Sequence, residues 1–219
     1  MTRIHAGATL DRPPGPKYAA ALDFAELAPP SPFPTERTLR RWRSELPEGL
    51  TLSWVVPATA ARSSRGPLRF DDAMTDAFAR AREAAQILGA RFAVLSTGAD
   101  VTTGPRDRAL LTEWVARWGA DAGQIVWQPT GLWEAERAIP FAAELGVLYA
   151  FDPLETDAVP VGEVVYARLR AIGTRTRFDE SRLEEALEAI EETEAADAYV
   201  AIESATSFRE ASRLAQLAG

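Results

Sequence analysis

Eight short apolar runs, separated by segments with helical spacing, are the feature that most constrains the fold of this chain. Runs this continuous are typical of parallel strands that are buried on both faces. Their regular alternation with helices indicates an α/β domain built on a parallel sheet. The runs are residues 3–7, 20–26, 51–56, 91–95, 124–128, 147–151, 164–170 and 198–202.

The intervening segments have helical stripes and helical end signals. From Phe70 to Leu88 the apolar residues recur at spacings of three and four, and Gly89 follows as a stop. Eight such units over 219 residues predict an eight-stranded (β/α)8 barrel, with a doubly wound open sheet as the alternative. The first connection, residues 9–17, is short and proline-rich, so we expect the barrel to be trimmed at its first β-α unit.

Composition removes several classes of chemistry. The chain has no cysteine and one histidine, which excludes thiolate metal sites and multi-histidine metal sites, and we predict no metal and no cofactor. A net charge of −8 makes nucleic acid an improbable partner. No run is long enough for a membrane helix, and the N-terminus lacks the apolar stretch of a signal peptide, so a cytoplasmic location is expected. With no internal linker, residues 1–219 are interpreted as one domain.

The seventh predicted strand has the most informative pattern. Strand alternation places Tyr166, Arg168 and Arg170 on one face, toward the barrel interior. Because an unpaired buried charge is costly, an interior arginine must be paired or bind an anion. The sequence leaves both alternatives open for Arg168: pairing with Glu26, Asp152 or Glu203, or contact with a ligand at the C-terminal mouth, where barrels place their sites.

Other polar residues at strand ends complete the candidate site. Glu26 and Asp152 are candidate acids, bases or, together with Glu203, Mg²⁺ ligands, although no motif spacing supports a metal; the alternative for Glu26 is an arginine counter-ion. Gln128 and Trp133 are candidate ligand contacts, with buried packing as the alternative for the tryptophan. His5 in the first strand is interpreted as a core histidine rather than a catalyst.

Several short motifs occur in a specific order along nearly the whole chain. They are Lys17-Tyr18 with Phe24-Ala25-Glu26, the segment from Thr38 to Pro47, Trp127-Gln128-Pro129-Thr130-Gly131-Leu132-Trp133, Asp152-Pro153, and Tyr166-Ala167-Arg168-Leu169 followed by Asp179 to Leu183. In these motifs the chain resembles the YecE-like family, domain of unknown function 72 (DUF72), and is most similar to its archaeal-type branch. The resemblance implies a TIM barrel and no established reaction.

The chain departs from the family pattern at polar positions. Gln128 and Thr130 stand where the family has glutamate and arginine, and Arg170 stands where it has histidine. Glu203 and Ser204 replace paired asparagines, and Ser96 replaces a glutamine. Glu26, Asp152, Tyr166 and Arg168 remain. Replacing acids and cations by neutral groups removes means of transferring protons or stabilising charge.

Two functional hypotheses follow. In the first, the chain is a divergent, non-catalytic barrel that acts by association with a protein partner, such as a related barrel. In the second, the mouth binds a small phosphorylated or carboxylate anion through Arg168 and Arg170, with possible turnover by Glu26 or Asp152. A nuclease role is a distant third, because nuclease barrels commonly use several histidines as metal ligands.

Overall fold

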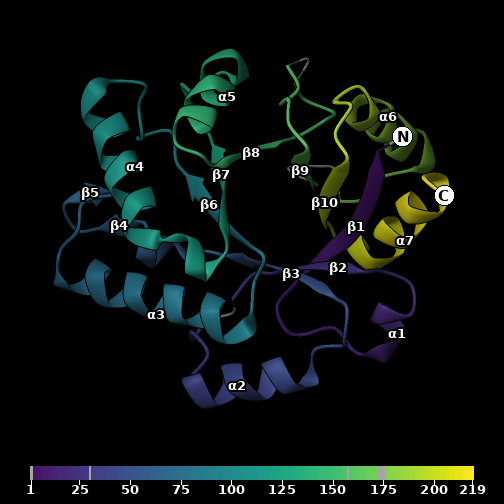
Figure 1. Cartoon of the computed structure of the whole chain (residues 1–219), viewed down its shortest axis with the longest axis horizontal. Helices are drawn as coiled ribbons and strands as arrows, with labels where there is room; N and C mark the ends of the chain where they lie inside the picture. The colour runs from purple at the N-terminus through teal and green to yellow at the C-terminus, as the bar shows by residue number, and fades with distance from the viewer. Residues whose placement is uncertain (1, 30, 157, 172–175) are drawn as a thin grey trace.

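The strands close into a parallel barrel in the order β1-β10-β9-β8-β7-β6-β3-β2. The computed structural model describes residues 2–29, 31–156, 158–171 and 176–219 (Figure 1). The barrel strands are β1 (Arg3–Leu10), β2 (Phe24–Leu27), β3 (Thr51–Val55), β6 (Phe92–Thr97), β7 (Gln124–Pro129), β8 (Leu148–Phe151), β9 (Val164–Arg170) and β10 (Asp197–Glu203). The predicted (β/α)8 barrel is confirmed, and the open-sheet alternative is wrong.

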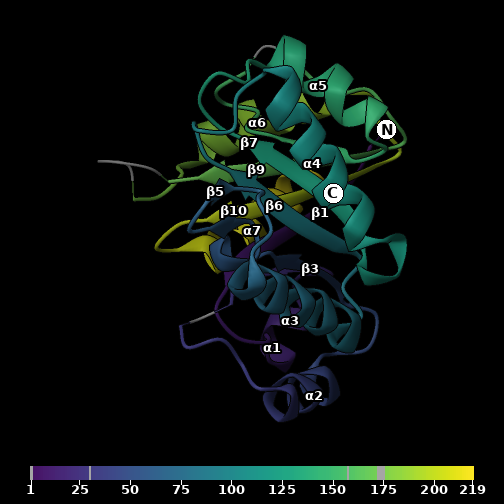
Figure 2. The same ribbon diagram turned by 90° about the vertical axis from the view of Figure 1, so that its left-hand side faces the viewer.

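Helices cover the outside of this barrel. They are α1 (Pro16–Ala19), α2 (Glu36–Glu45), α3 (Asp72–Leu88), α4 (Pro105–Trp118), α5 (Ala135–Glu144), α6 (Glu180–Glu191) and α7 (Ser207–Leu217). Figure 1 shows α2 and α3 on one side of the molecule and α6 and α7 on another, and Figure 2 shows the strands slanting between these layers. A small hairpin, β4 (Arg62–Ser63) and β5 (Gly66–Pro67), follows β3.

Local sequence signals set the helix ends. Asp71 precedes α3, and its carboxylate accepts a hydrogen bond from the Met74 amide at 2.8 Å, which satisfies a first-turn donor. Gly89 ends the same helix at φ 66°, a left-handed conformation that glycine adopts without strain. Thr35 and Asp179 cap α2 and α6 in the same way as Asp71 caps α3.

The barrel is reduced at two units rather than one. The first unit has only the four-residue helix α1, as expected from its short connection. The described residues between Phe151 and Val164 contain no helix, so the unit after β8 is reduced as well. The second strand also starts later than residue 20, because the Ala20 and Leu22 amides bond back to carbonyls of α1.

Side chains inside the barrel form layers along its axis. Phe24, Phe92, Tyr166 and Tyr199 fill the middle with edge-to-face ring contacts, among them Phe92–Tyr199 at 4.7 Å between centroids. The alternate residues of β9, Val165, Ala167 and Leu169, belong to the outer core beneath the helices. The predicted inward and outward faces of this strand are therefore confirmed, and the filled interior leaves polar groups only toward its two ends.

Gly7 allows β1 to pass close to the aromatic layer. A Cβ atom at this position would lie 2.5 Å from the Phe24 carbonyl oxygen and 2.7 Å from its ring. We expect Gly7→Ala to lower the free energy of unfolding by about 1–3 kcal/mol through overpacking, measured by urea denaturation. Gly15→Ala is the matched control, because no atom lies within 4 Å of its added Cβ. Equal stability of the two variants would contradict the close approach.

Candidate functional site at the barrel mouth

Glu26 is the central acidic group of the mouth. It is the third residue of β2, its side chain lies inside the barrel, and it is fully buried. Its Oε2 accepts a hydrogen bond from the Tyr166 hydroxyl at 2.8 Å, and its Oε1 accepts from Arg168 at 2.7 Å and from Thr9 at 2.9 Å. Both carboxylate oxygens thus accept hydrogen bonds from side chains of two other strands, β9 and β1.

Arg168 is the central cation, and it is 5% exposed. One terminal nitrogen pairs with Glu26 and lies 3.6 Å from Glu203, and the other donates to the Gln128 side-chain oxygen. Burial acts to lower the pKa of Arg168, but the Glu26 charge and other neighbours outweigh it and leave the pKa raised. The arginine therefore stays charged, and the internal-pairing alternative describes its contacts: two of the three acids proposed as its partners lie beside it.

Tyr166 links the acid to the wall of the barrel. Its hydroxyl lies 2.9 Å from the Ser53 hydroxyl as well as donating to Glu26. Since a phenol has one proton, Ser53 is the donor in the second contact. Burial, followed by the Glu26 charge, raises the pKa of Tyr166 well above its ordinary value. The phenol therefore keeps its proton and serves as a fixed donor.

A second ion pair lies at the rim. Arg170 donates through Nε to Glu203 at 2.7 Å, and the two side chains are 37% and 44% exposed. Ser96 donates to Gln128 at 3.0 Å and so joins the rim to Arg168. The four charged groups of the mouth, two glutamates and two arginines, balance each other.

Two further predicted site residues make other contacts in the described part of the chain. The Asp152 carboxylate accepts from the Leu154 amide at 3.0 Å and shapes the turn after β8. Trp133 is 5% exposed; its ring stacks on Phe141 of α5 at 5.2 Å and meets Trp127 edge to face at 4.9 Å. The structure therefore gives Trp133 the packing role that was its alternative. Ligand contact by Gln128, Tyr166, Arg168, Arg170 and Glu203 stays a prediction.

Thr9 and Ser53 belong to the site but are absent from the predicted set. Both are paired in register with Glu26, Thr9 from β1 and Ser53 from β3. Strand alternation together with the pairing register of β2 with β1 and β3 would have predicted both residues. The sequence of a single strand does not specify that register. Among the described residues, no group of three or more acidic or histidine side chains is placed to hold a metal ion.

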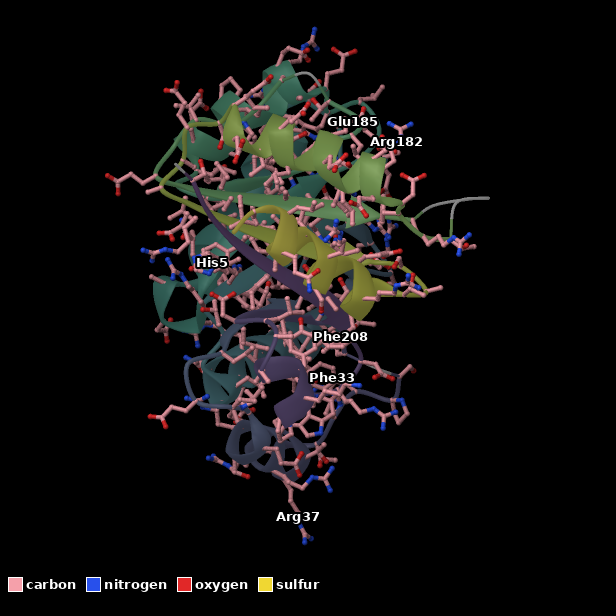
Figure 3. The ribbon with its side chains drawn as sticks, turned by 90° about the vertical axis from the view of Figure 1, so that its right-hand side faces the viewer. His5, Phe33, Arg37, Arg182, Glu185 and Phe208 are labelled. Atoms are coloured by element: carbon pink, nitrogen blue, oxygen red, sulfur yellow. The ribbon has the colours of Figure 1, made fainter. Side chains whose placement is uncertain are left out.

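The opposite end of the barrel holds the single histidine. His5 Nδ1 lies 2.6 Å from Asp23 and Nε2 lies 3.0 Å from Asp197, and the ring stacks on Tyr199 at 4.5 Å. Arg91 donates to the Tyr199 hydroxyl at 2.6 Å. Figure 3 shows His5 toward one end of the barrel, away from Phe208 at the other. His5 is thus remote from the mouth.

Protonation of His5 is expected to stabilise the fold. Hydrogen bonding to Asp23 is the largest contribution; it outweighs burial and, with Asp197, raises the pKa of His5 above 6.5. A raised folded-state pKa gives stability that is complete below the unfolded value and is lost as pH rises through the folded value. Denaturant titrations from pH 6 to pH 9 should show this loss in the wild type and not in His5→Gln. The same slope in both would contradict the assignment.

At acidic pH, the ionisation of Asp197 makes the stability change with pH in the opposite direction. Its hydrogen bond from His5 lowers the pKa of Asp197, so this contribution is present above its unfolded value and is lost as pH falls through the folded one.

The barrel and its mouth define a class of protein: a small TIM barrel with a charge-balanced polar cluster at the C-terminal ends of its strands. Its structural neighbours are DUF72 family proteins. One from Enterococcus faecalis has 15% identity and a TM-score of 0.65 over 99% of this chain and 97% of that chain. Another, from Thermotoga maritima, has 12% identity and a TM-score of 0.70 over 90% and 84%. The family that the motifs resemble is thus found among structures of the same fold.

Sugar-related barrels have the same fold. A xylose isomerase domain containing protein from Salmonella typhimurium has 14% identity and a TM-score of 0.61 over 97% of this chain and 94% of that chain. Neither a family model nor a curated protein sequence matches the chain. At these identities the comparisons establish the fold. Separately, no helix in the described part of the chain is long and apolar enough to cross a membrane.

Proposed function

We propose that this chain is a divergent DUF72 barrel that performs no chemistry at its mouth and acts by association with a protein partner, a related barrel being the first candidate. The observation that carries the proposal is the ion pair between Glu26 and Arg168, both buried and joined at 2.7 Å. Placement in the archaeal-type branch of the family stays a prediction.

A general acid or base must exchange protons with a substrate within hydrogen-bonding reach. The Glu26 carboxylate already accepts bonds from Tyr166, Arg168 and Thr9. A substrate would have to displace these donors and separate a buried ion pair, which costs several kcal/mol. Cavities of about 710, 450, 310 and 460 Å³ in the described part of the chain are lined by residues other than Glu26, Tyr166 and Arg168. These features support a mouth with a structural role.

The loop after β7 offers a place for a protein contact. Leu132 lies in this loop, at the mouth end of the barrel, and is 64% exposed. Large apolar side chains at the centre of a protein interface contribute much of its binding energy when water is excluded from them. Leu132→Asp should therefore weaken the association, while leaving the thermal midpoint within a few degrees of the wild type.

A thermal-shift screen against sugars, phosphosugars, nucleotides, carboxylates and divalent metals tests the absence of a mouth ligand. A ligand at a hundred times its Kd adds about 2.7 kcal/mol to the free energy of unfolding. Arg170→Ala and Gln128→Ala alter the accessible part of the mouth. We expect that any thermal shift seen with the wild type is also seen with these two variants. A shift that either variant abolishes would overturn the proposal. Native mass spectrometry of the tagged chain with a related barrel from the same cells tests the association directly.

Binding of a small anion is the second candidate, and one observation favours it. The Arg170 side chain is 37% exposed at the rim, so its guanidinium can still meet a solute although Nε is bonded to Glu203. Arg168 is occupied by internal partners, so Arg170 would make the first contact. A phosphorylated or carboxylate ligand whose affinity falls at least tenfold in Arg170→Ala would favour this function over association alone.

A further inference from the structure

A groove of about 450 Å³ lies between the loop after β1 and the start of α7. It is lined by residues 10–15 together with Lys17, Tyr18 and Phe208. The Tyr18 and Phe208 rings contact each other at 5.3 Å between centroids and so join α1 to α7. Figure 3 shows Phe208 between these two helices. The groove is separate from the Glu26–Arg168 cluster and contains none of its residues.

The floor of the groove is apolar. Pro13, Pro14, Leu10 and Phe208 contribute side chains without a hydrogen-bonding group. Tyr18 presents its ring but not its hydroxyl, because that hydroxyl donates to the Phe24 carbonyl at 2.7 Å and accepts from the Ala8 amide at 2.7 Å. Burial raises the pKa of Tyr18, so the phenol stays neutral. A ligand here meets rings and hydrocarbon rather than polar groups.

The rim of the groove carries a cation with no fixed counter-ion. Lys17 is the only lysine in the chain and is exposed on α1. In the parts of the chain that the structure describes, no carboxylate forms an ion pair with it. The other two charges of the rim, Arg12 and Asp11, pair with each other at 3.3 Å. The groove therefore combines an apolar floor with one uncompensated positive charge.

We propose that this groove binds an organic monoanion, a carboxylate joined to an aromatic ring or a medium-length alkyl chain. The carboxylate meets the Lys17 ammonium, and the apolar body lies against Tyr18 and Phe208. The volume is within the range of small-molecule sites, which are mostly apolar with a few polar groups that fix orientation. Inorganic anions would leave the floor unfilled, and neutral hydrocarbons would leave Lys17 unpaired. This inference is independent of the function proposed for the mouth.

Because Lys17 is the only lysine, an amine-reactive reagent reports on the groove directly. The intact protein is modified with a limiting reagent in the presence of octanoate or phenylacetate, and Lys17 and the N-terminal amine are quantified by peptide mass spectrometry. At ten times its Kd, a ligand that covers Lys17 slows its modification about tenfold. The N-terminal amine serves as the internal control and should react at an unchanged rate.

Calorimetric titration of variants separates the two parts of the site. Lys17→Gln should weaken octanoate binding about tenfold, the factor equivalent to 1.4 kcal/mol, and Lys17→Arg should keep most of the affinity. Phe208→Ala should also weaken it by opening the floor. Arg209→Gln is the matched control: it removes an exposed cation next to Phe208 that does not line the groove, and should leave affinity unchanged.

Three results would overturn the proposal. The first is no binding of octanoate or phenylacetate at 10 mM, a concentration at which a Kd would be about 2.7 kcal/mol weaker than one of 0.1 mM. The second is equal affinity for octanoate and 1-octanol. The third is unchanged octanoate affinity in Lys17→Gln. Lys17 is an exposed residue of a four-residue helix, so its variants retain the fold, which thermal unfolding verifies.

Discussion

Arg168→Ala is expected to lower the free energy of unfolding by about 3–5 kcal/mol, which is the usual cost of breaking a buried ion pair by removing one partner. The physical reason is the charge left behind: Glu26 is fully buried and loses its 2.7 Å bond from Arg168. Gln128 loses a donor at the same time. For a chain of this size the loss corresponds to a fall in the thermal midpoint of about 10 °C. Chemical denaturation measures the free energy and thermal denaturation measures the midpoint, both followed by circular dichroism.

A double variant tests whether the unpaired Glu26 carboxylate causes the loss of stability. Replacing both charges, as Glu26→Gln with Arg168→Met, removes the unpaired carboxylate, so we expect it to recover at least half of the lost stability. Arg170→Ala is the control at the rim, where an exposed pair contributes about 0–1 kcal/mol. If Arg168→Ala were no more destabilising than Arg170→Ala, the buried pair would not have the role described.

Phe92→Ala is expected to cost about 3–5 kcal/mol, because it removes a large ring from a packed interior. Phe92 is fully buried and contacts Tyr166 at 5.5 Å and Tyr199 at 4.7 Å between ring centroids. The two tyrosines are held by hydrogen bonds at their hydroxyls, so they cannot move far to fill the cavity. Thermal and urea unfolding measure the loss.

The matched control for Phe92 is Phe33, a partly buried ring that makes one edge-to-face contact, with Trp54 at 6.0 Å. Phe33→Ala should cost less than half as much as Phe92→Ala. Similar losses for both would show that the interior collapses around the missing ring, contrary to the rigid layer described.

The sequence predicted the architecture because the strands of a closed parallel barrel are buried on both faces and so appear as continuous apolar runs. The bounds of β9 were predicted correctly for this reason. The start of β2 was not, since the residues after α1 are as apolar as a strand and only their backbone bonds to α1 distinguish them. The described residues between β8 and β9 form no helix, and the sequence there has turn residues without a periodic apolar pattern.

The sequence predicted most residues of the polar cluster, but not which of them contact each other. The inward face of β9 follows from alternation, so Tyr166 and Arg168 were found together, and Glu26 and Glu203 were among the expected partners of Arg168. Asp152 was expected at the same mouth because it follows a strand, but its carboxylate accepts the Leu154 amide in the turn. Strand ends place residues at one rim, and only the direction of each side chain decides which of them meet.

The aromatic layer lies between two polar networks, one toward each end of the barrel axis. Its two tyrosines direct their hydroxyls to opposite ends, Tyr166 to Glu26 and Tyr199 to Arg91, with Phe24 and Phe92 between them. Among the residues that the structure describes, the hydrogen bonds of the mouth and those around His5 share no side chain. The effects of substitutions at the two ends on the free energy of unfolding should therefore add.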